Sequence, residues 1–212
     1  MIGAVAPGWP VSLRDGPVLL RPYRRGDAAT WSRLRVANQD WLERWESSPP
    51  GRWEELNSPT AYRYLYRDQT RSARRGESMP FAIWLDEYRH ERLVGHINLG
   101  NIVRRAFCST YVGYWIDSRV AGRGIMPTAL ALAVDHAFTA GGLHRIEVNI
   151  RPENVPSRRV VEKLGFRQEA YHERYLHIDG AWRDHIGYAI TSEDVFAEGG
   201  LLARWHRLRA AA

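Results

Sequence analysis

The sequence has almost no cysteine and no long hydrophobic run. Cys108 is the only cysteine among 212 residues, which excludes a disulfide framework and a cysteine-based metal site and favours a cytoplasmic location. No apolar run approaches the ~20 residues that a membrane-spanning helix needs. Residues 1–10 lack the basic and apolar regions of a signal peptide, so we expect no membrane partner.

Lysine is also nearly absent. Lys163 is the only lysine, and arginine carries almost all of the positive charge. The formal net charge is +6 at pH 7. A positive excess suits a polyanionic cofactor or a nucleic-acid-rich partner such as a ribosome, and it is equally typical of a genome that favours arginine. The arginines of residues 71–75 are more typical of a solvated face than of a binding patch.

The length and composition predict one globular domain. The hydrophobic fraction is 44% and the charged fraction 25%, as in ordinary globular proteins, and the chain is long enough to bury one substantial core. There is no internal repeat. We expect one domain over residues 1–212, with its core between about residues 17 and 195.

Local patterns predict a mixed α/β domain. Three consecutive strands joined by short polar turns indicate an antiparallel meander, and the Asp-Gly pair at residues 179–180 indicates a hairpin near the C-terminal end. The expected strands are residues 18–21, 80–86, 92–102, 108–116, 145–151, 171–177 and 182–191. The expected helices follow Asp27 and Asn154 and span residues 60–74 and 125–140.

A glycine-rich turn, Arg-Val-Ala-Gly-Arg-Gly at residues 119–124, lies between the last strand of the meander and the next helix. Glycines let the backbone approach a ligand closely, and the first amides of the helix point their N–H groups at an anion such as a pyrophosphate. In dinucleotide-binding folds such a turn closes the first strand of a parallel sheet, whereas here it follows a meander. The turn therefore predicts an anion site of another kind.

Four motifs in this order resemble the GCN5-related N-acetyltransferase superfamily. Arg119-x-x-Gly122-x-Gly124 is similar to its Q/R-x-x-G-x-G/A acetyl-CoA loop, and residues 113–117 resemble its fourth strand. Asn154 followed by Leu-Gly-Phe at residues 164–166 resembles its next helix. The Asp-Gly-x-Trp-x-Asp-His stretch at residues 179–185 resembles the C-terminal hairpin of the RimJ/RimL branch, the ribosomal-protein N-terminal acetyltransferases. The segment after Glu198 matches no family motif.

The resemblance implies a fold and a cofactor. The fold would be a central mixed, mostly antiparallel sheet that splays at an acetyl-CoA cleft and is flanked by helices, and no metal ion is implied. Pantetheine would pair with the splayed strand, while the glycine loop would hold the pyrophosphate. The implied cofactor-binding residues are Tyr114, Trp115, Ile116, Arg119, Ala121, Gly122, Arg123, Gly124, Ile125, Met126, Asn154 and Ser157. Core packing of the Trp115 side chain and helix capping by Asn154 are compatible alternatives.

Acetyl transfer to an amine requires a proton acceptor for the amine, N–H donors for the oxyanion and a proton donor for the thiolate. Direct transfer needs no covalent enzyme intermediate, so Cys108 is expected to be a small strand residue. In many relatives the acid is a tyrosine seven residues after the capping asparagine, but here that position is Val161. RimL-like relatives have a serine one turn earlier, at Ser157, which is our predicted acid. Helix capping is its alternative role.

The general base is less clearly marked. Some relatives have a glutamate five residues before the capping asparagine, and that position is Asn149 here. The RimJ/RimL resemblance makes Glu77 the leading substitute, with a solvated loop glutamate as its alternative role. His96 has a suitable intrinsic pKa, with a structural role as its alternative, and water is a third option. Further cleft candidates are Tyr171, Tyr175 and His185.

The predicted function is acetyl-CoA-dependent transfer to a primary amine, foremost the N-terminus of a protein such as a ribosomal protein. Trp41, Trp45 and Trp53 would wall the acceptor site or belong to the core. The alternatives are acetylation of a small-molecule amine, and a catalytically weak CoA-sensing or ribosome-binding protein, which the missing tyrosine motivates. A homodimer through the C-terminal strands is also expected.

Overall fold

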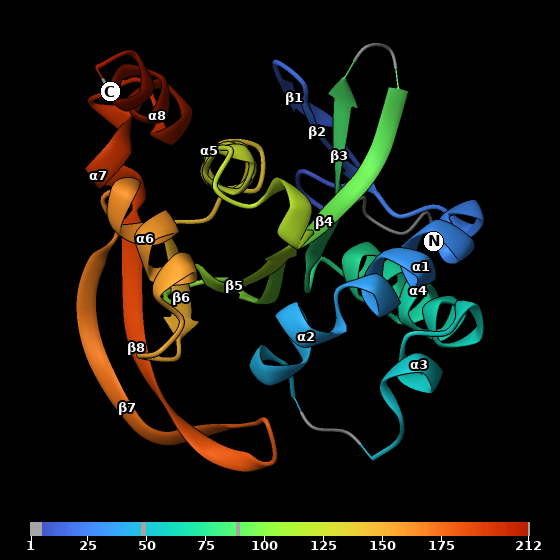
Figure 1. Ribbon diagram of the computed structural model, residues 1–212. Coiled ribbons are helices and arrows are strands. Elements are labelled where there is room, and N and C mark those ends of the chain that lie inside the picture. Colours follow the sequence, from blue (N-terminus) through green and yellow to red (C-terminus); the bar gives the residue numbers. More distant parts are fainter. Residues whose placement is uncertain (1–5, 48–49, 88–89, 212) are drawn as a thin grey trace.

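The computed structural model describes residues 6–47, 50–87 and 90–211, which form a mixed α/β fold around one open sheet (Figure 1). The strands are β1 (Leu13–Asp15), β2 (Val18–Pro22), β3 (Met79–Glu87), β4 (His90–Val103), β5 (Ser109–Ile116), β6 (Arg145–Ile150), β7 (Arg167–Ile178) and β8 (Ala181–Thr191). The helices are α1 (Ala28–Ala37), α2 (Gln39–Leu42), α3 (Trp53–Leu56), α4 (Pro59–Arg74), α5 (Ile125–Phe138), α6 (Val155–Lys163), α7 (Ser192–Phe196) and α8 (Leu201–Ala210). Short 3-10 turns span Arg25–Asp27, Glu43–Trp45 and Ser118–Val120. Among the described residues, no helix is long and apolar enough to cross a membrane.

The eight-stranded sheet has the order β1-β2-β3-β4-β5-β6-β8-β7. Every neighbouring pair is antiparallel except β5 and β6, which run parallel. These two strands pair only at their first residues, from Ser109 with Arg145 to Tyr111 with Glu147, and then diverge. The predicted meander and the mostly antiparallel, splayed sheet are confirmed.

Strand alternation places a different helical layer on each face of the sheet. Phe81 and Ile83 of β3 belong to the large core cluster with α5, whereas Ala82 between them packs in a second cluster with α1 and α4. Helix α5 is apolar nearly all round and almost fully buried because it contacts the sheet, α6 and α8. The sheet therefore carries α5 on one face and α1 and α4 on the other (Figure 1).

Local signals set the starts of two helices. Ser58 caps α4 by accepting from the Ala61 N–H at 3.1 Å, and Pro59 occupies the first turn, where its missing N–H costs nothing. Asn154 caps α6 in the same way by accepting from the Ser157 N–H at 3.2 Å. The predicted cap at Asn154 is thus confirmed, and it fixes the orientation of the first turn of α6.

Helix α8 is an element that the sequence motifs did not predict. Asp135 of α5 accepts hydrogen bonds from the N–H groups of Leu201 and Leu202, at 2.7 and 3.0 Å, and so caps this helix from outside its own segment. Trp205, which is buried, donates its indole N–H to Thr128 Oγ1 at 2.9 Å. These contacts fasten the C-terminal helix along α5.

Candidate functional site

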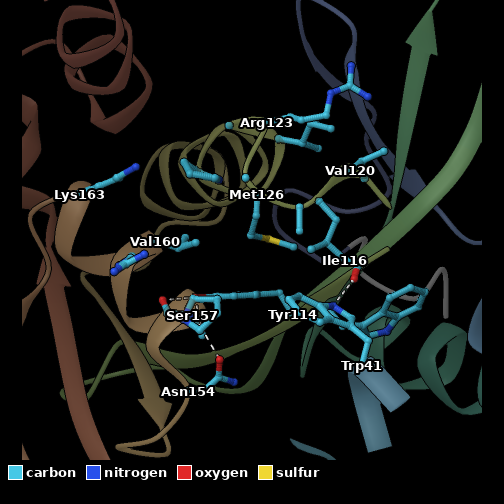
Figure 2. Close-up of a pocket in the computed structure, with 18 of the residues that line it drawn as sticks. Trp41, Tyr114, Ile116, Val120, Arg123, Met126, Asn154, Ser157, Val160 and Lys163 are labelled. Atoms are coloured by element: carbon cyan, nitrogen blue, oxygen red, sulfur yellow. Dashed lines mark hydrogen bonds between the residues drawn. The ribbon is translucent and has the colours of Figure 1, made fainter. Parts of the chain in front are cut away.

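The divergence of β5 and β6 opens a cleft of about 590 Å³. Helix α5 begins at its floor, α6 forms one wall, and α2 and α8 contribute residues from the flanks (Figure 2). Every cofactor-binding residue predicted above except Arg119 lines this cleft. Residues that sequence motifs did not assign to it include Trp41, Val120, Arg159, Val160, Lys163, Trp205 and Arg209.

The edge of β5 that faces the cleft offers backbone hydrogen-bonding groups. The carbonyl of Trp115 faces β4, so close to Gly95 that a Cβ built there would lie 2.5 Å from it. Because backbone groups alternate along a strand, those of Tyr114 and Ile116 face the cleft. Trp41 donates its indole N–H to the Ile116 carbonyl at 3.0 Å (Figure 2). The N–H groups of both residues and the Tyr114 carbonyl can therefore pair with an extended ligand.

The glycine loop presents the N-terminus of α5 to the same cleft. Gly122 and Gly124 both have φ of +79°, a left-handed conformation that side chains disfavour. Gly124 is the N-cap of α5 and supplies no side-chain acceptor, so the N–H groups of Ile125 and Met126 have no intrahelical partner. Unpaired N–H groups at the positive end of a helix form an anion site.

Asp117 anchors the start of the loop. Its buried carboxylate accepts from Arg119 Nε at 3.0 Å and Nη2 at 2.7 Å, and from Asn38 Nδ2 at 3.2 Å. Burial alone would raise the pKa of Asp117, but the hydrogen bonds from Arg119 and Asn38 outweigh it and hold the pKa below its usual value. The Arg119 side chain is thus directed to Asp117 rather than into the cleft.

Three cations of the cleft have no acidic partner in the described part of the chain: Arg159, Lys163 and Arg209. Arg123 differs, because its guanidinium pairs with Glu87 and its side chain turns away from Ser157 and Tyr114 (Figure 2). The loop amides and the unpaired cations together suit a ligand with several phosphate charges.

Ser157 and Tyr114 meet at the inner end of the cleft. Ser157 Oγ donates to Tyr114 Oη at 3.0 Å, and Tyr114 Oη donates to the Ser157 carbonyl at 3.3 Å (Figure 2). Burial raises the pKa of the Tyr114 phenol well above its usual value, so the phenol stays protonated at neutral pH. Val161, the position of the usual tyrosine, is fully buried in the core instead. A tyrosine hydroxyl from β5 therefore supports Ser157 from across the cleft.

Two further cavities adjoin the cleft. One of about 350 Å³ shares Tyr114, Trp115 and Ser157 with it, and one of about 620 Å³ reaches between α1, α3 and α4. Glu46 lines the cleft and both cavities. The tip of the β7–β8 hairpin closes over this region, where Asp179 donates its N–H to the Glu46 carbonyl at 3.3 Å. The three spaces thus share Glu46 and Trp115 as lining residues, and this row of adjoining spaces is called the path below.

A buried arginine holds Glu46 in place. Arg35 Nη1 donates to Glu46 Oε1 at 2.6 Å, and Arg35 Nε donates to Asn57 Oδ1 at 2.8 Å. The guanidinium also lies over the rings of Trp53 and Trp115, with its Cζ 4.7 and 5.1 Å from their centroids. Glu46 Oε2 has no hydrogen-bond partner among the described residues. One carboxylate oxygen is therefore free beside the path.

The structure does not bring Glu77 to this path. Glu77 precedes β3, and six residues of strand, about 20 Å, separate it from Ile83 beside the splay. Its carboxylate is exposed and accepts from Arg75 Nε and Nη2, both at 2.7 Å. These hydrogen bonds lower the pKa of Glu77, which makes it a weaker base.

His96 and His185 do line the intermediate cavity. The His96 Nδ1 lies 3.0 Å from the Phe81 carbonyl and must donate to it, which leaves Nε2 as an acceptor. Burial lowers the pKa of His96 to about 4, so the ring is neutral at pH 7. Tyr171 and Tyr175 lie on exposed positions of β7, outside the residues that line the three spaces.

Sequence reasoning missed Glu46, Arg35 and helix α8 as parts of the site. Glu46 and Arg35 come together only through tertiary packing, so no local pattern marks them. For α8 a signal was present: two glycines at residues 199–200 precede leucines at 201, 202 and 208 and Trp205, an amphipathic helical spacing.

Comparison with known proteins agrees with this geometry. The model of the acetyltransferase (GNAT) domain matches residues 18–167. The chain is 31% identical to "Probable N-acetyltransferase YjcK" of Bacillus subtilis (86% of this chain, 98% of the relative) and 30% identical to "[Ribosomal protein uS5]-alanine N-acetyltransferase" of Escherichia coli (87% and 92%). Among solved structures, Mycobacterium smegmatis RimJ in complex with CoA-disulfide matches with 42% identity, a TM-score of 0.89 and coverage of 98% and 97%.

The chain belongs to the GNAT family of acetyltransferases and is close to the RimJ/RimL ribosomal-protein N-acetyltransferases. The resemblance inferred from the four motifs is confirmed at the level of family and fold.

A substitution at the last glycine of the loop tests the assignment of the cleft. We expect Gly124→Val to weaken acetyl-CoA binding about 10- to 100-fold, because valine strains a φ of +79° and its Cβ would lie 3.3 Å from Trp205 Cζ2. Calorimetric titration with acetyl-CoA measures this. Gly26→Val is the control, since a Cβ at Gly26 meets nothing within 4 Å. Unchanged affinity in a folded Gly124→Val protein would contradict the loop assignment.

Proposed function

We propose that the protein transfers the acetyl group of acetyl-CoA directly to the N-terminal α-amine of a protein, such as a ribosomal protein. The observation that carries this proposal is that the cofactor cleft adjoins a cavity of about 620 Å³, with Glu46 and Trp115 lining both spaces, and this cavity is large enough for an extended peptide end. The similar Escherichia coli protein is named as an acetyltransferase of an alanine of ribosomal protein uS5, which supports a protein acceptor. The net charge of +6 favours binding to a ribosome, which is rich in negative charge. A cytoplasmic enzyme and a homodimer through the C-terminal strands are part of this proposal.

The residues of the cleft fit acetyl-CoA, which supplies the activated acetyl thioester when bound. The open edge of β5 at Tyr114 and Ile116 pairs with the pantetheine arm. The first amides of α5 hold the pyrophosphate. The N–H groups of the β5 edge also orient the thioester carbonyl and donate to its oxygen as negative charge develops.

Ser157 is the proposed proton donor to the sulfur that leaves. Its hydroxyl lies at the inner end of the cleft and is held by the capped first turn of α6 and by Tyr114 Oη. Because the Tyr114 phenol remains protonated, it can donate to Ser157 Oγ when the serine proton turns to the sulfur.

Glu46 is the proposed binding group for the acceptor amine. Glu46 lines both the cofactor cleft and the acceptor cavity, its Oε2 has no hydrogen-bond partner among the described residues, and Arg35 fixes its position through Oε1. A carboxylate there attracts an ammonium group and holds it near the thioester until a proton is lost to water, since a pKa of about 4 makes His96 a weak base. Glu46 thus replaces Glu77 as the acidic group of the acceptor side.

Turnover with a panel of acceptors tests the function. We expect release of free CoA from acetyl-CoA with peptides that begin with a small residue, and none with the same peptides blocked at the N-terminus. Turnover confined to polyamines or other small amines would instead identify a small-molecule acetyltransferase. Binding of acetyl-CoA without turnover on any amine would refute the catalytic proposal and leave a CoA-sensing protein.

Removal of the Ser157 hydroxyl tests its role. We expect Ser157→Ala to lower kcat about 100-fold while the Kd for acetyl-CoA stays near that of the wild type, because general acid catalysis is lost and the cleft is otherwise intact. Steady-state kinetics at saturating acetyl-CoA measure the effect. Ser192→Ala, in the first turn of α7 and outside the residues that line the three spaces, is the matched control. An unchanged kcat would remove Ser157 from the mechanism.

Neutralising Glu46 tests the amine-binding group. We expect Glu46→Gln to raise the KM for a peptide acceptor about 10-fold, because glutamine still accepts from Arg35 but carries no charge for the ammonium group. The Kd for acetyl-CoA should stay unchanged, whereas the melting temperature should fall, because the buried Arg35 loses its acidic partner. Glu43→Gln is the control. Of the three spaces Glu43 lines only the acceptor cavity, and its carboxylate accepts a hydrogen bond from Gln39 Nε2. Equal KM values for the two variants would exclude Glu46 from acceptor binding.

A further inference from the structure

Helix α8 forms an outer wall of the cofactor cleft although it lies beyond the family model, which ends at residue 167. Trp205 and Arg209 of this helix line the cleft. They are four residues apart and so share one face of the helix. Trp205 lies against the last glycine of the loop, since a Cβ at Gly124 would be 3.3 Å from its Cζ2. The C-terminal helix therefore lies beside the anion site.

The direction of the ligand along the cleft follows from α6. Ser157, in its first turn, marks the thioester end, and Lys163 is its last residue. Six residues of helix place these two about 9 Å apart along the axis. Figure 2 shows Lys163 and Ile116 on opposite sides of Met126, which lies in the first turn of α5. The part of the ligand that lies past the pyrophosphate must therefore run toward Lys163 and α8.

The cations at this outer end differ from their neighbours on α8. Arg204 and Arg207 both contact Glu198. Arg209, on the same helix, has no acidic partner and instead lies over the Trp205 ring, with its Cζ 5.9 Å from the centroid. Lys163 also has no acidic partner among the described residues. Two uncompensated cations thus flank the outer end of the cleft.

We propose that α8 binds the 3′-phosphoadenosine end of CoA, with Arg209 as a ligand of the 3′-phosphate and Lys163 facing it from α6. The inference rests on the proposed use of acetyl-CoA and assigns its nucleotide end to a helix outside the family's conserved model. The loop amides already serve the pyrophosphate, so the 3′-phosphate needs these separate cations. Arg209 is exposed and reaches the phosphate from the end of α8.

The contribution of the 3′-phosphate can be isolated with dephospho-CoA, which lacks this group alone. We expect the wild-type protein to bind CoA more tightly than dephospho-CoA in calorimetric titrations. Arg209→Ala should weaken CoA binding about 5- to 10-fold and leave dephospho-CoA binding nearly unchanged, because a charge-assisted contact is removed only where the phosphate exists. Lys163→Ala should show the same selectivity.

Arg207→Ala is the matched control, since it removes the same charge from the same helix at a residue that pairs with Glu198. This substitution should weaken the binding of CoA and of dephospho-CoA equally, or leave both unchanged. An Arg209→Ala protein whose ratio of the two dissociation constants matches the wild type would overturn the inference. Failure of the wild-type protein to bind acetyl-CoA would instead contradict the proposed function, so the two failures are distinguishable.

Discussion

The short parallel pairing of β5 with β6 is the constraint on which the site depends. Only residues from Ser109 to Tyr111 pair with β6, so the remaining backbone of β5 is left without a strand on one side. Unpaired strand edges normally invite association. Here the edge lies within a cleft, one carbonyl accepts from Trp41, and the rest faces a narrow space. The protein thus keeps a sheet edge open for a ligand without exposing it to another chain.

The two halves of the site are built by different physical means. On the cofactor side, backbone amides and unpaired cations dominate, and their positions follow from strand alternation and the start of α5. On the acceptor side, a charged pair is held among tryptophans from separate segments. Ser157 lies where the two halves meet, and Tyr114 links it back to β5. Backbone geometry therefore dominates the proposed cofactor side, while side-chain packing shapes the proposed acceptor space.

Much of the fold and of the cofactor cleft could be predicted from sequence, because the signals are local. Glycines at 122 and 124, the cap at Asn154 and the alternation of β5 all act within a few residues. The acceptor side could not be predicted in this way. Arg35 and Glu46 come together only through tertiary packing. The family resemblance pointed to Glu77, but its carboxylate pairs with Arg75 at the far end of β3. Helix α8 has a local signal in the glycines at 199–200 and the apolar spacing after them, but its cap could not be predicted in this way, because Asp135 precedes Leu201 by 66 residues.

The capping of α8 by Asp135 has a consequence for the C-terminus. Helix α5 holds α8 through Asp135 and Thr128, and its own N-terminus lines the cleft where the cofactor is proposed to bind. If α8 contacts CoA only when docked, docking and ligand binding are linked equilibria, and each strengthens the other by the same factor. Bound CoA would then stabilise the docked position of α8.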